Sequence, residues 1–235
     1  WKAAYCLSCM ANSLSWSVAA YRKQGFVALG MDCRSGKGVS NFAPAVREQL
    51  LPALLEKRAA HGMTGAPIRL MVVGIPNVGK SSFINRMAQS KRAKVEDRPG
   101  VTRTKQWVKI GSNMELLDMP GVLWPKFDDQ TVAQKLAFTG AINDDVMDLE
   151  ALACLLLQRL AVSYPKALEE RYRMTDLQAI QEDGFAMLEL LGRKRGMLIS
   201  GGEVNTERAA ITLLDEFRSG KLGRITLELP EQEAL

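Results

Sequence analysis

The first half of the chain alternates short apolar runs with segments in which apolar residues recur at helical spacing. Runs of strand length occupy residues 26–33, 68–73, 106–110 and 114–118. Helical spacing occupies residues 15–24, 41–55 and 81–90. Gly111 and its neighbours form a turn between the last two runs and predict a hairpin there. Strands and helices in alternation are typical of an α/β domain.

The second half has mostly helical periodicity. Its predicted helices span residues 131–138, 149–163, 166–173, 177–191 and 207–219. Residues 224–229 alternate like a single strand. We therefore expect two domains, an α/β domain at residues 1–130 and a mostly helical domain at residues 131–235.

Composition narrows the possible classes of protein. Of 235 residues, 47% are hydrophobic and 24% charged, which excludes a disordered, collagen-like or coiled-coil chain. No apolar run reaches the ~18 residues of a membrane span, and we recognise no secretory leader, so we expect a cytoplasmic protein without a membrane partner. Cys6 and Cys9 have a zinc-type spacing but no second pair, so we expect no metal site there.

Charge is distributed unevenly. Up to Gln130 there are 19 basic and 9 acidic residues (+10), and the rest has 12 basic and 17 acidic residues (−5). A basic first half is typical of a protein that binds a polyanion such as nucleotide phosphate or RNA, although an ordinary solvated surface also explains it. Residues 86–109 and the triplet 193–195 are the basic segments that could contact RNA, and a helix end with favourable dipole placement explains the triplet equally well.

Residues 74–81 (GIPNVGKS) match the phosphate-binding pattern G-x-x-x-x-G-K-[S/T] between a predicted strand and a predicted helix. In such a loop, backbone N–H groups turn toward the phosphates. Lys80 would neutralise the β- and γ-phosphates, and the Ser81 hydroxyl would bind Mg²⁺. We predict that the phosphates contact Asn77, Val78, Gly79, Lys80, Ser81 and Ser82.

Two further segments fit a nucleotide-dependent switch. Asp118 begins a D-x-x-G sequence after an apolar run, so its carboxylate could hold Mg²⁺ while the Gly121 N–H contacts the γ-phosphate. Between these motifs, Thr102 follows a Pro-Gly turn and could close on Mg²⁺ and the γ-phosphate. Each segment alone is also compatible with an ordinary turn or a basic surface loop.

Together, residues 74–81, 99–103 and 118–125 resemble the circularly permuted GTPases of the RbgA/YlqF family, which assist assembly of the large ribosomal subunit. Residues 32–38 (DCRSGKG) are similar to that family's base-contacting loop, which assigns Asp32 and Cys33 to the nucleotide. This loop precedes the phosphate loop, whereas in ordinary GTPases it comes last. Further similarity to the family's helical RNA-binding tail lies at residues 138–143, 194–202 and 223–228.

The resemblance implies a P-loop GTPase domain, circularly permuted, followed by a mostly helical RNA-binding domain. It implies GTP and GDP as ligands with Mg²⁺. Its implied partners are the precursor of the large ribosomal subunit and its rRNA, with no DNA partner, and we expect a monomer.

The chain departs from the family pattern in two ways. It contains no [Asn/Thr]-Lys-x-Asp motif, and Asp32 is its first Asp. The family's N-terminal segment before that motif, which carries a further strand of the sheet, is also missing. We therefore interpret the chain as truncated at its N-terminus, with an incomplete sheet that splits or in which residues 3–8 pair out of their usual place. The alternative to a GTPase is a non-hydrolysing RNA- or ribosome-binding fragment, and an unrelated NTPase is disfavoured by the motif order.

Hydrolysis would need a group that D-x-x-G does not supply. Val122 follows this motif where many small GTPases have a water-orienting glutamine, and its side chain cannot hydrogen-bond water. Asn77 matches the asparagine with which potassium-dependent GTPases hold K⁺, although Asn also favours turns. The predicted catalytic residues are thus Lys80, Thr102 and Asn77, with Ser81, Thr102 and Asp118 at the metal.

The missing motif predicts weak discrimination between guanine and adenine. Without a carboxylate that binds two guanine donors, we expect GTP and ATP to compete within roughly tenfold of each other, about 1.4 kcal/mol. Competition against a labelled GTP analogue measures this ratio. A preference for GTP beyond about a hundredfold would show that another residue recognises the base.

Overall fold

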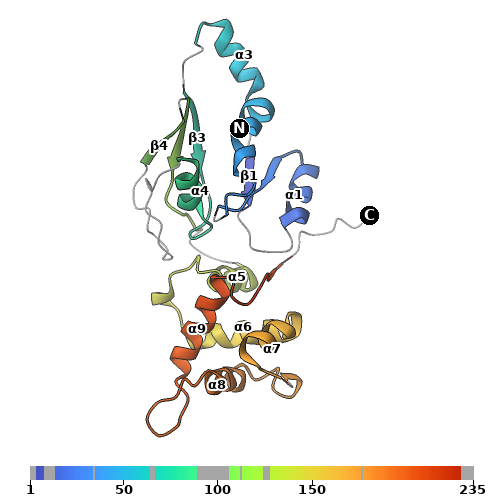
Figure 1. Ribbon diagram of the computed structural model, residues 1–235, viewed down its shortest axis with the longest axis vertical. Helices are drawn as coiled ribbons and strands as arrows, with labels where there is room; N and C mark the ends of the chain where they lie inside the picture. The colour runs from blue at the N-terminus through green and yellow to red at the C-terminus, as the bar shows by residue number, and fades with distance from the viewer. Residues whose placement is uncertain are drawn as a thin grey trace. The chain divides into compact units, whose positions relative to one another are not determined.

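The computed structural model describes residues 4–7, 14–33, 35–63, 67–88, 106–111, 113–123, 128–175 and 177–228 (Figure 1). Two compact units make up the chain. The first comprises Trp1–Leu123 with Thr226–Leu235, and the second Trp124–Ile225. No helix among the described residues is both long and apolar enough to cross a membrane.

A three-stranded sheet of order β3-β5-β4 lies in the first unit. β3 (Ile68–Val72) runs parallel to β5 (Met114–Asp118), and β4 (Gln106–Ile110) runs antiparallel to β5. The predicted hairpin around Gly111 is confirmed. Because Val72 is in register with Asp118, β3 and β5 end at the same edge of the sheet.

The remaining described strands form a separate parallel pair. β1 (Ala4–Leu7) pairs with β2 (Val27–Gly30), and α1 (Leu14–Lys23) connects them. The described strands therefore form two sheets, one of two strands and one of three.

An apolar cluster joins helical residues 42–50 and 83–84 to the β3-β5-β4 sheet. It contains the edge-to-face ring pair of Phe42 and Phe83, whose centroids are 5.0 Å apart. Sheet residues that face it include Ile68, Val108 and Leu116, of which Leu116 is fully buried. These side chains attach α4 (Lys80–Met87) to this sheet.

The predicted helix at residues 41–55 is interrupted in the structure. It consists of η1 (Val39–Asn41), α2 (Phe42–Ala45), the π-helical η2 (Val46–Leu50) and α3 (Pro52–Ala60). Leu51 leaves helical geometry, with φ −121° and ψ 18°, immediately before Pro52. A proline disfavours the helical conformation in the residue before it, and this explains the break.

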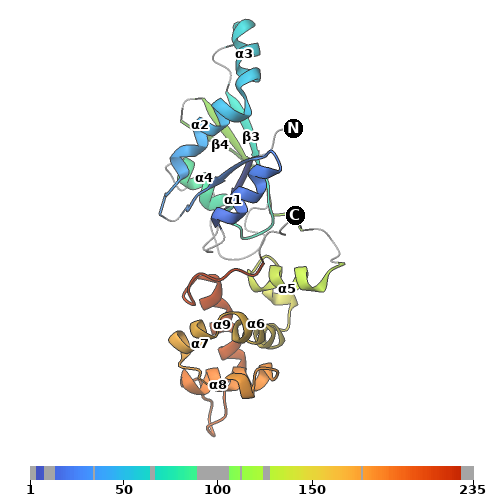
Figure 2. The same ribbon diagram turned by 90° about the vertical axis from the view of Figure 1, so that its right-hand side faces the viewer.

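The second unit is helical. Its elements, shown again in Figure 2, are α5 (Gln130–Phe138), η3 (Asp144–Val146), α6 (Leu149–Ser163), α7 (Pro165–Tyr172), η4 (Leu177–Ala179), α8 (Gly184–Lys194) and α9 (Thr206–Arg218). Side-chain oxygens of Asp129, Asp148, Asp183 and Asn205 accept backbone hydrogen bonds at the starts of α5, α6, α8 and α9.

Two sequence predictions for this half of the chain are wrong. The helix predicted at residues 177–191 is divided into η4 and α8, because Asp183 caps a new start and Gly184 packs on Cys154, where a Cβ would lie 2.7 Å from the Cys154 Cβ. Residues 224–228 form no strand. An alternating pattern alone does not provide a neighbouring strand with which to pair.

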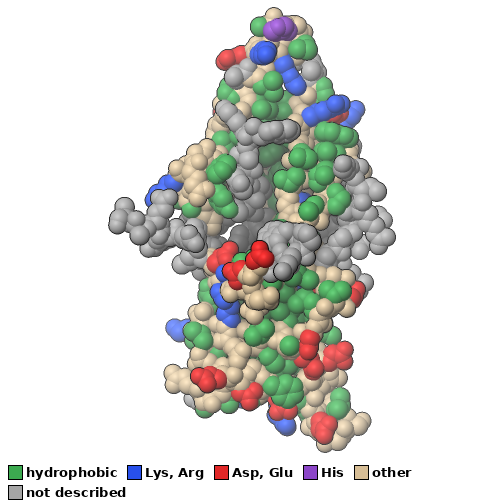
Figure 3. Space-filling view, turned by 180° about the vertical axis from the view of Figure 1, so that it is seen from behind, with side chains coloured by type: hydrophobic (Ala, Val, Ile, Leu, Met, Phe, Trp, Pro, Cys, Tyr) green, Lys and Arg blue, Asp and Glu red, His purple; other side chains and the backbone are tan. Residues whose placement is uncertain are grey.

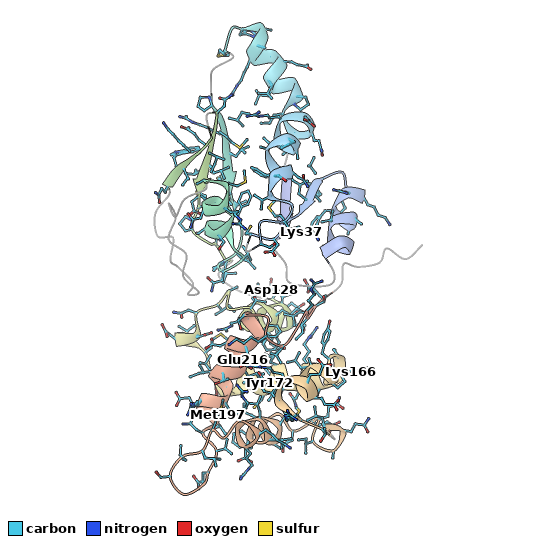
Figure 4. All side chains as sticks on the ribbon, in the orientation of Figure 1. Lys37, Asp128, Lys166, Tyr172, Met197 and Glu216 are labelled. Carbon is cyan, nitrogen blue, oxygen red and sulfur yellow. The ribbon has the colours of Figure 1, made fainter. Side chains whose placement is uncertain are left out.

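Ion pairs at Glu216 and at Arg218 attach α9 to the rest of its unit. Glu216, 5% exposed, accepts hydrogen bonds from Arg171 Nε and from the Tyr172 hydroxyl, both at 2.9 Å, and Figure 4 shows Tyr172 and Glu216 side by side. Arg218 pairs with Asp144 and donates to the carbonyl oxygens of Ala137 and Phe138. The Arg171 hydrogen bonds hold the pKa of Glu216 below its ordinary value, while burial raises the pKa of the Tyr172 hydroxyl.

Substitution Glu216→Gln should destabilise the second unit by about 2 kcal/mol at neutral pH, because it weakens charge-assisted hydrogen bonds at a buried site. Since the folded-state pKa of Glu216 is depressed, its contribution is complete above the ordinary glutamate pKa of about 4.3 and is lost as pH falls through the folded value. Urea unfolding of the full chain, followed by circular dichroism at several pH values, measures both effects.

The matched control is Asp215→Asn, an equal change of charge at the preceding exposed position of α9. Equal destabilisation by the two substitutions would contradict a specific role for Glu216.

Candidate nucleotide site

The phosphate loop connects the end of β3 to the start of α4, as its motif requires. Gly79 caps α4 in a left-handed conformation with φ 89°, and Asn77 is also left-handed with φ 58°. Asn tolerates this conformation better than most residues, which supports the interpretation of Asn77 as a turn residue. It does not test the predicted K⁺ contact.

Lys80 lies along this loop. Its Nζ donates hydrogen bonds to the carbonyl oxygens of Gly74 at 3.0 Å and Ile75 at 2.7 Å. Partial burial lowers the pKa of Lys80, and the negative charge of Asp118 acts in the opposite direction. The ammonium is thus held beside the backbone that would surround the phosphates.

Ser81 and Asp118 come together at the edge where β3 and β5 end. The Ser81 hydroxyl Oγ donates to Asp118 Oδ2 at 3.4 Å, and Asp118 is only 1% exposed. A hydroxyl beside a carboxylate is a donor set suited to Mg²⁺ together with phosphate and water oxygens. Among the described residues no group of three or more His, Cys, Asp or Glu could hold a metal, so the ion would depend on phosphates for further ligands.

The D-x-x-G loop packs directly on the phosphate loop. The Val122 N–H donates to the Gly74 carbonyl at 3.4 Å. A Cβ on Gly121 would lie 2.6 Å from the Cα of Pro76, so only glycine fits this approach. The contact of Gly121 with Pro76 has no signal in the sequence, because nothing in the motif spacing specifies this neighbour.

The loop at residues 32–38 is closed by its own hydrogen bonds. Asp32 N–H donates to the Lys37 carbonyl at 2.9 Å, and Gly36 N–H donates to the Asp32 carbonyl at 2.8 Å. The Ser35 hydroxyl donates to Asp32 Oδ2 at 2.7 Å. Lys37, labelled in Figure 4, belongs to the same turn.

The two residues assigned to the base have different environments. Asp32 is exposed, whereas the Cys33 side chain is 9% exposed and belongs to the apolar cluster of the first unit. A base could therefore reach the backbone of Cys33 more readily than its thiol. Thr102 lies outside the described residues, so its assignment stays a prediction. Val78 and Ser82 lie on either side of the Gly79-Lys80-Ser81 sequence of the phosphate loop.

Comparison with known proteins identifies relatives that match most of this chain. The profile described as 50S ribosome-binding GTPase matches residues 69–182. Ribosome biogenesis GTPase A of Bacillus cereus is 41% identical over 215 residues, which are 92% of this chain and 71% of that protein. The Bacillus licheniformis protein of the same name is 43% identical over 211 residues, 90% of this chain and 73% of that protein.

Solved structures show the same fold. YlqF from T. maritima, in a GNP-bound crystal structure, superposes with a TM-score of 0.56 at 22% identity, over 98% of this chain and 82% of that chain. In the sequence of this chain, the 32–38 loop precedes the phosphate loop at residues 74–81. The chain therefore belongs to the ribosome biogenesis GTPase A family and has that family's circularly permuted P-loop GTPase fold, followed by a helical domain.

Proposed function

We propose that the chain binds GTP with Mg²⁺, hydrolyses it, and uses the exchange between GTP and GDP to control its association with the precursor of the large ribosomal subunit. The observation that carries this proposal is the convergence of two motifs on one loop. Ser81 contacts Asp118, and Gly121 packs on Pro76. A γ-phosphate bound to the phosphate loop would therefore lie next to the segment that follows Asp118.

Each residue has a defined task in this proposal. Lys80 binds the β- and γ-phosphate oxygens, with backbone N–H groups of residues 77–82 around the β-phosphate. Ser81 and Asp118 would hold Mg²⁺, which would supply positive charge at the phosphates, and Thr102 would complete that site. The Gly121 N–H contacts the γ-phosphate, so its loop rearranges when this phosphate is lost.

The water-orienting group comes from elsewhere. Val122 is 68% exposed and has no hydrogen-bonding side chain. We propose that a bound K⁺, held by Asn77, supplies positive charge at the transferring phosphate, and that the ribosomal particle stimulates turnover. The second candidate function, a non-hydrolysing ribosome-binding fragment, is favoured by the same Val122 and by the engagement of the Asp32 carboxylate with Ser35.

RNA contacts are proposed to be local. On the face seen in Figure 3, acidic and basic side chains are interspersed over the second unit. Arg195 is one of the three basic residues at 193–195. Its Nη2 lies 3.4 Å from Glu216 Oε1, so it already forms an ion pair within its own unit. The basic segment at residues 86–109 remains the stronger proposal for contact with rRNA phosphates, and such binding should weaken as salt is added.

The proposed function predicts that large ribosomal subunits stimulate GTP turnover and that Lys80→Ala strongly weakens nucleotide binding. A folded chain without this ammonium loses a charged contact to two phosphates. We expect affinity for a labelled GTP analogue to fall at least about a hundredfold, roughly 2.8 kcal/mol. Phosphate release with and without subunits measures turnover.

Lys57→Ala, at an exposed position of α3, is the control for loss of a lysine in the same unit. Binding without turnover, even with subunits, would favour the non-hydrolysing alternative. Unchanged affinity in folded Lys80→Ala protein would refute the assigned phosphate site.

The potassium proposal predicts faster turnover in K⁺ than in Na⁺ at equal ionic strength. Because Asn77 is left-handed, Asn77→Gly removes the amide without adding backbone strain and should abolish the difference between the salts. Asn77→Ala should abolish it too, but with additional destabilisation of the loop. Equal rates of the unsubstituted protein in both salts would contradict the proposal.

A further inference from the structure

One side of α4 contacts both the 32–38 loop and the start of α2, which follows that loop. Phe83 packs edge-to-face on Phe42, which begins α2 shortly after that loop. Three residues further along α4, the Arg86 guanidinium lies against Gly36 inside the loop. A Cβ built on Gly36 would be 2.6 Å from Arg86 Nη2 and 3.0 Å from Arg86 Cζ. Residues three apart on a helix share a side, so one surface of α4 makes both contacts.

The loop is well suited to being held in this way. Met31 and Cys33 anchor its beginning in the apolar cluster, at 2% and 9% exposure. Gly36 has φ +84°, a left-handed conformation that favours glycine, and its N–H closes the turn onto Asp32. The guanidinium therefore packs on backbone whose conformation is already fixed locally.

The same helix begins at the phosphate loop. Lys80 is its first residue, and Arg86 follows after six residues, or about 9 Å along the axis at ~1.5 Å per residue. A nucleotide whose phosphates lie at the start of α4 and whose base reaches the 32–38 loop would thus contact two segments that α4 connects.

We infer that Arg86 is a positioning residue that fixes the base-contacting loop relative to the phosphate loop, and that it thereby supplies the base-dependent part of nucleotide affinity. This inference rests on the proposed nucleotide site. Arg86 does not contact the phosphates in this role. Its effect is preorganisation of the position of the loop, since a loop that must be brought into place on binding lowers affinity.

The test compares a ligand that has a base with one that lacks it. GDP and inorganic pyrophosphate, each with Mg²⁺, are titrated into the full-length chain and into its Arg86→Ala variant by calorimetry or by competition with a labelled GDP. We expect the variant to lose roughly tenfold in GDP affinity, about 1.4 kcal/mol, while pyrophosphate affinity stays within about twofold. Arg86→Lys keeps the charge and the aliphatic stem but not the planar group. Its GDP affinity should therefore lie between those of the unsubstituted chain and of Arg86→Ala.

Arg47→Ala, at an exposed position of η2, controls for the loss of one positive charge in the same unit. A merely structural role for Arg86 in α4 would weaken both ligands equally, and that result overturns the inference, as does unchanged GDP affinity. If the unsubstituted chain itself binds neither ligand, the proposed function fails first and the inference fails with it.

A second variant approaches the contact from the loop. Gly36→Ala should weaken GDP binding through backbone strain and through collision with the guanidinium. In an Arg86→Ala background only the strain remains, so the additional loss from Gly36→Ala should be smaller there. Strictly additive effects of the two substitutions would show that Arg86 and Gly36 do not act through each other.

Discussion

The parallel register of β3 and β5 is the constraint on which the nucleotide site depends. Asp118 shares the buried face of β5 with Met114 and Leu116, which are 3% and 0% exposed. Because side chains alternate between faces, a slip of one residue would turn Asp118 away from α4 and expose both apolar residues. The hydrophobic alternation of β5 thus also determines where the Asp118 carboxylate lies, and burial of the core and placement of Asp118 beside Ser81 cannot be separated.

The second unit obtains its order differently. It has no large sheet among its described residues, and its last helix is fixed by charged groups in addition to apolar packing. Glu216 is held by Arg171 and Tyr172, whereas Arg218 is held by Asp144 and two carbonyl groups. Such pairs require defined geometry, so they specify one arrangement of α9 more than they add to net stability.

Much of the fold could be predicted from the sequence, because the strongest signals are local. The phosphate loop, the hairpin of β4 and β5 and the separate helical half follow from spacing and turn residues. The break before Pro52 and the new helix start at Asp183 also have local signals, but the apolar periodicity continues across both and conceals them. Contacts between distant segments, such as Gly121 on Pro76 and Arg86 on Gly36, have no signal in spacing, since they depend on how the elements pack.

The position of Lys80 indicates how little the phosphate site would need to change on binding. Its ammonium already donates to the carbonyl oxygens of Gly74 and Ile75, which keep the side chain folded along the loop. Burial lowers the pKa of this group, but the nearby charge of Asp118 opposes that effect, so the site partly compensates for removing a cation from water. A phosphate would then meet an ammonium whose conformational freedom is already reduced, and less ordering entropy opposes binding than with a freely mobile lysine. At the proposed phosphate site these carbonyl groups would therefore favour nucleotide binding through Lys80, even though they would repel the phosphates directly.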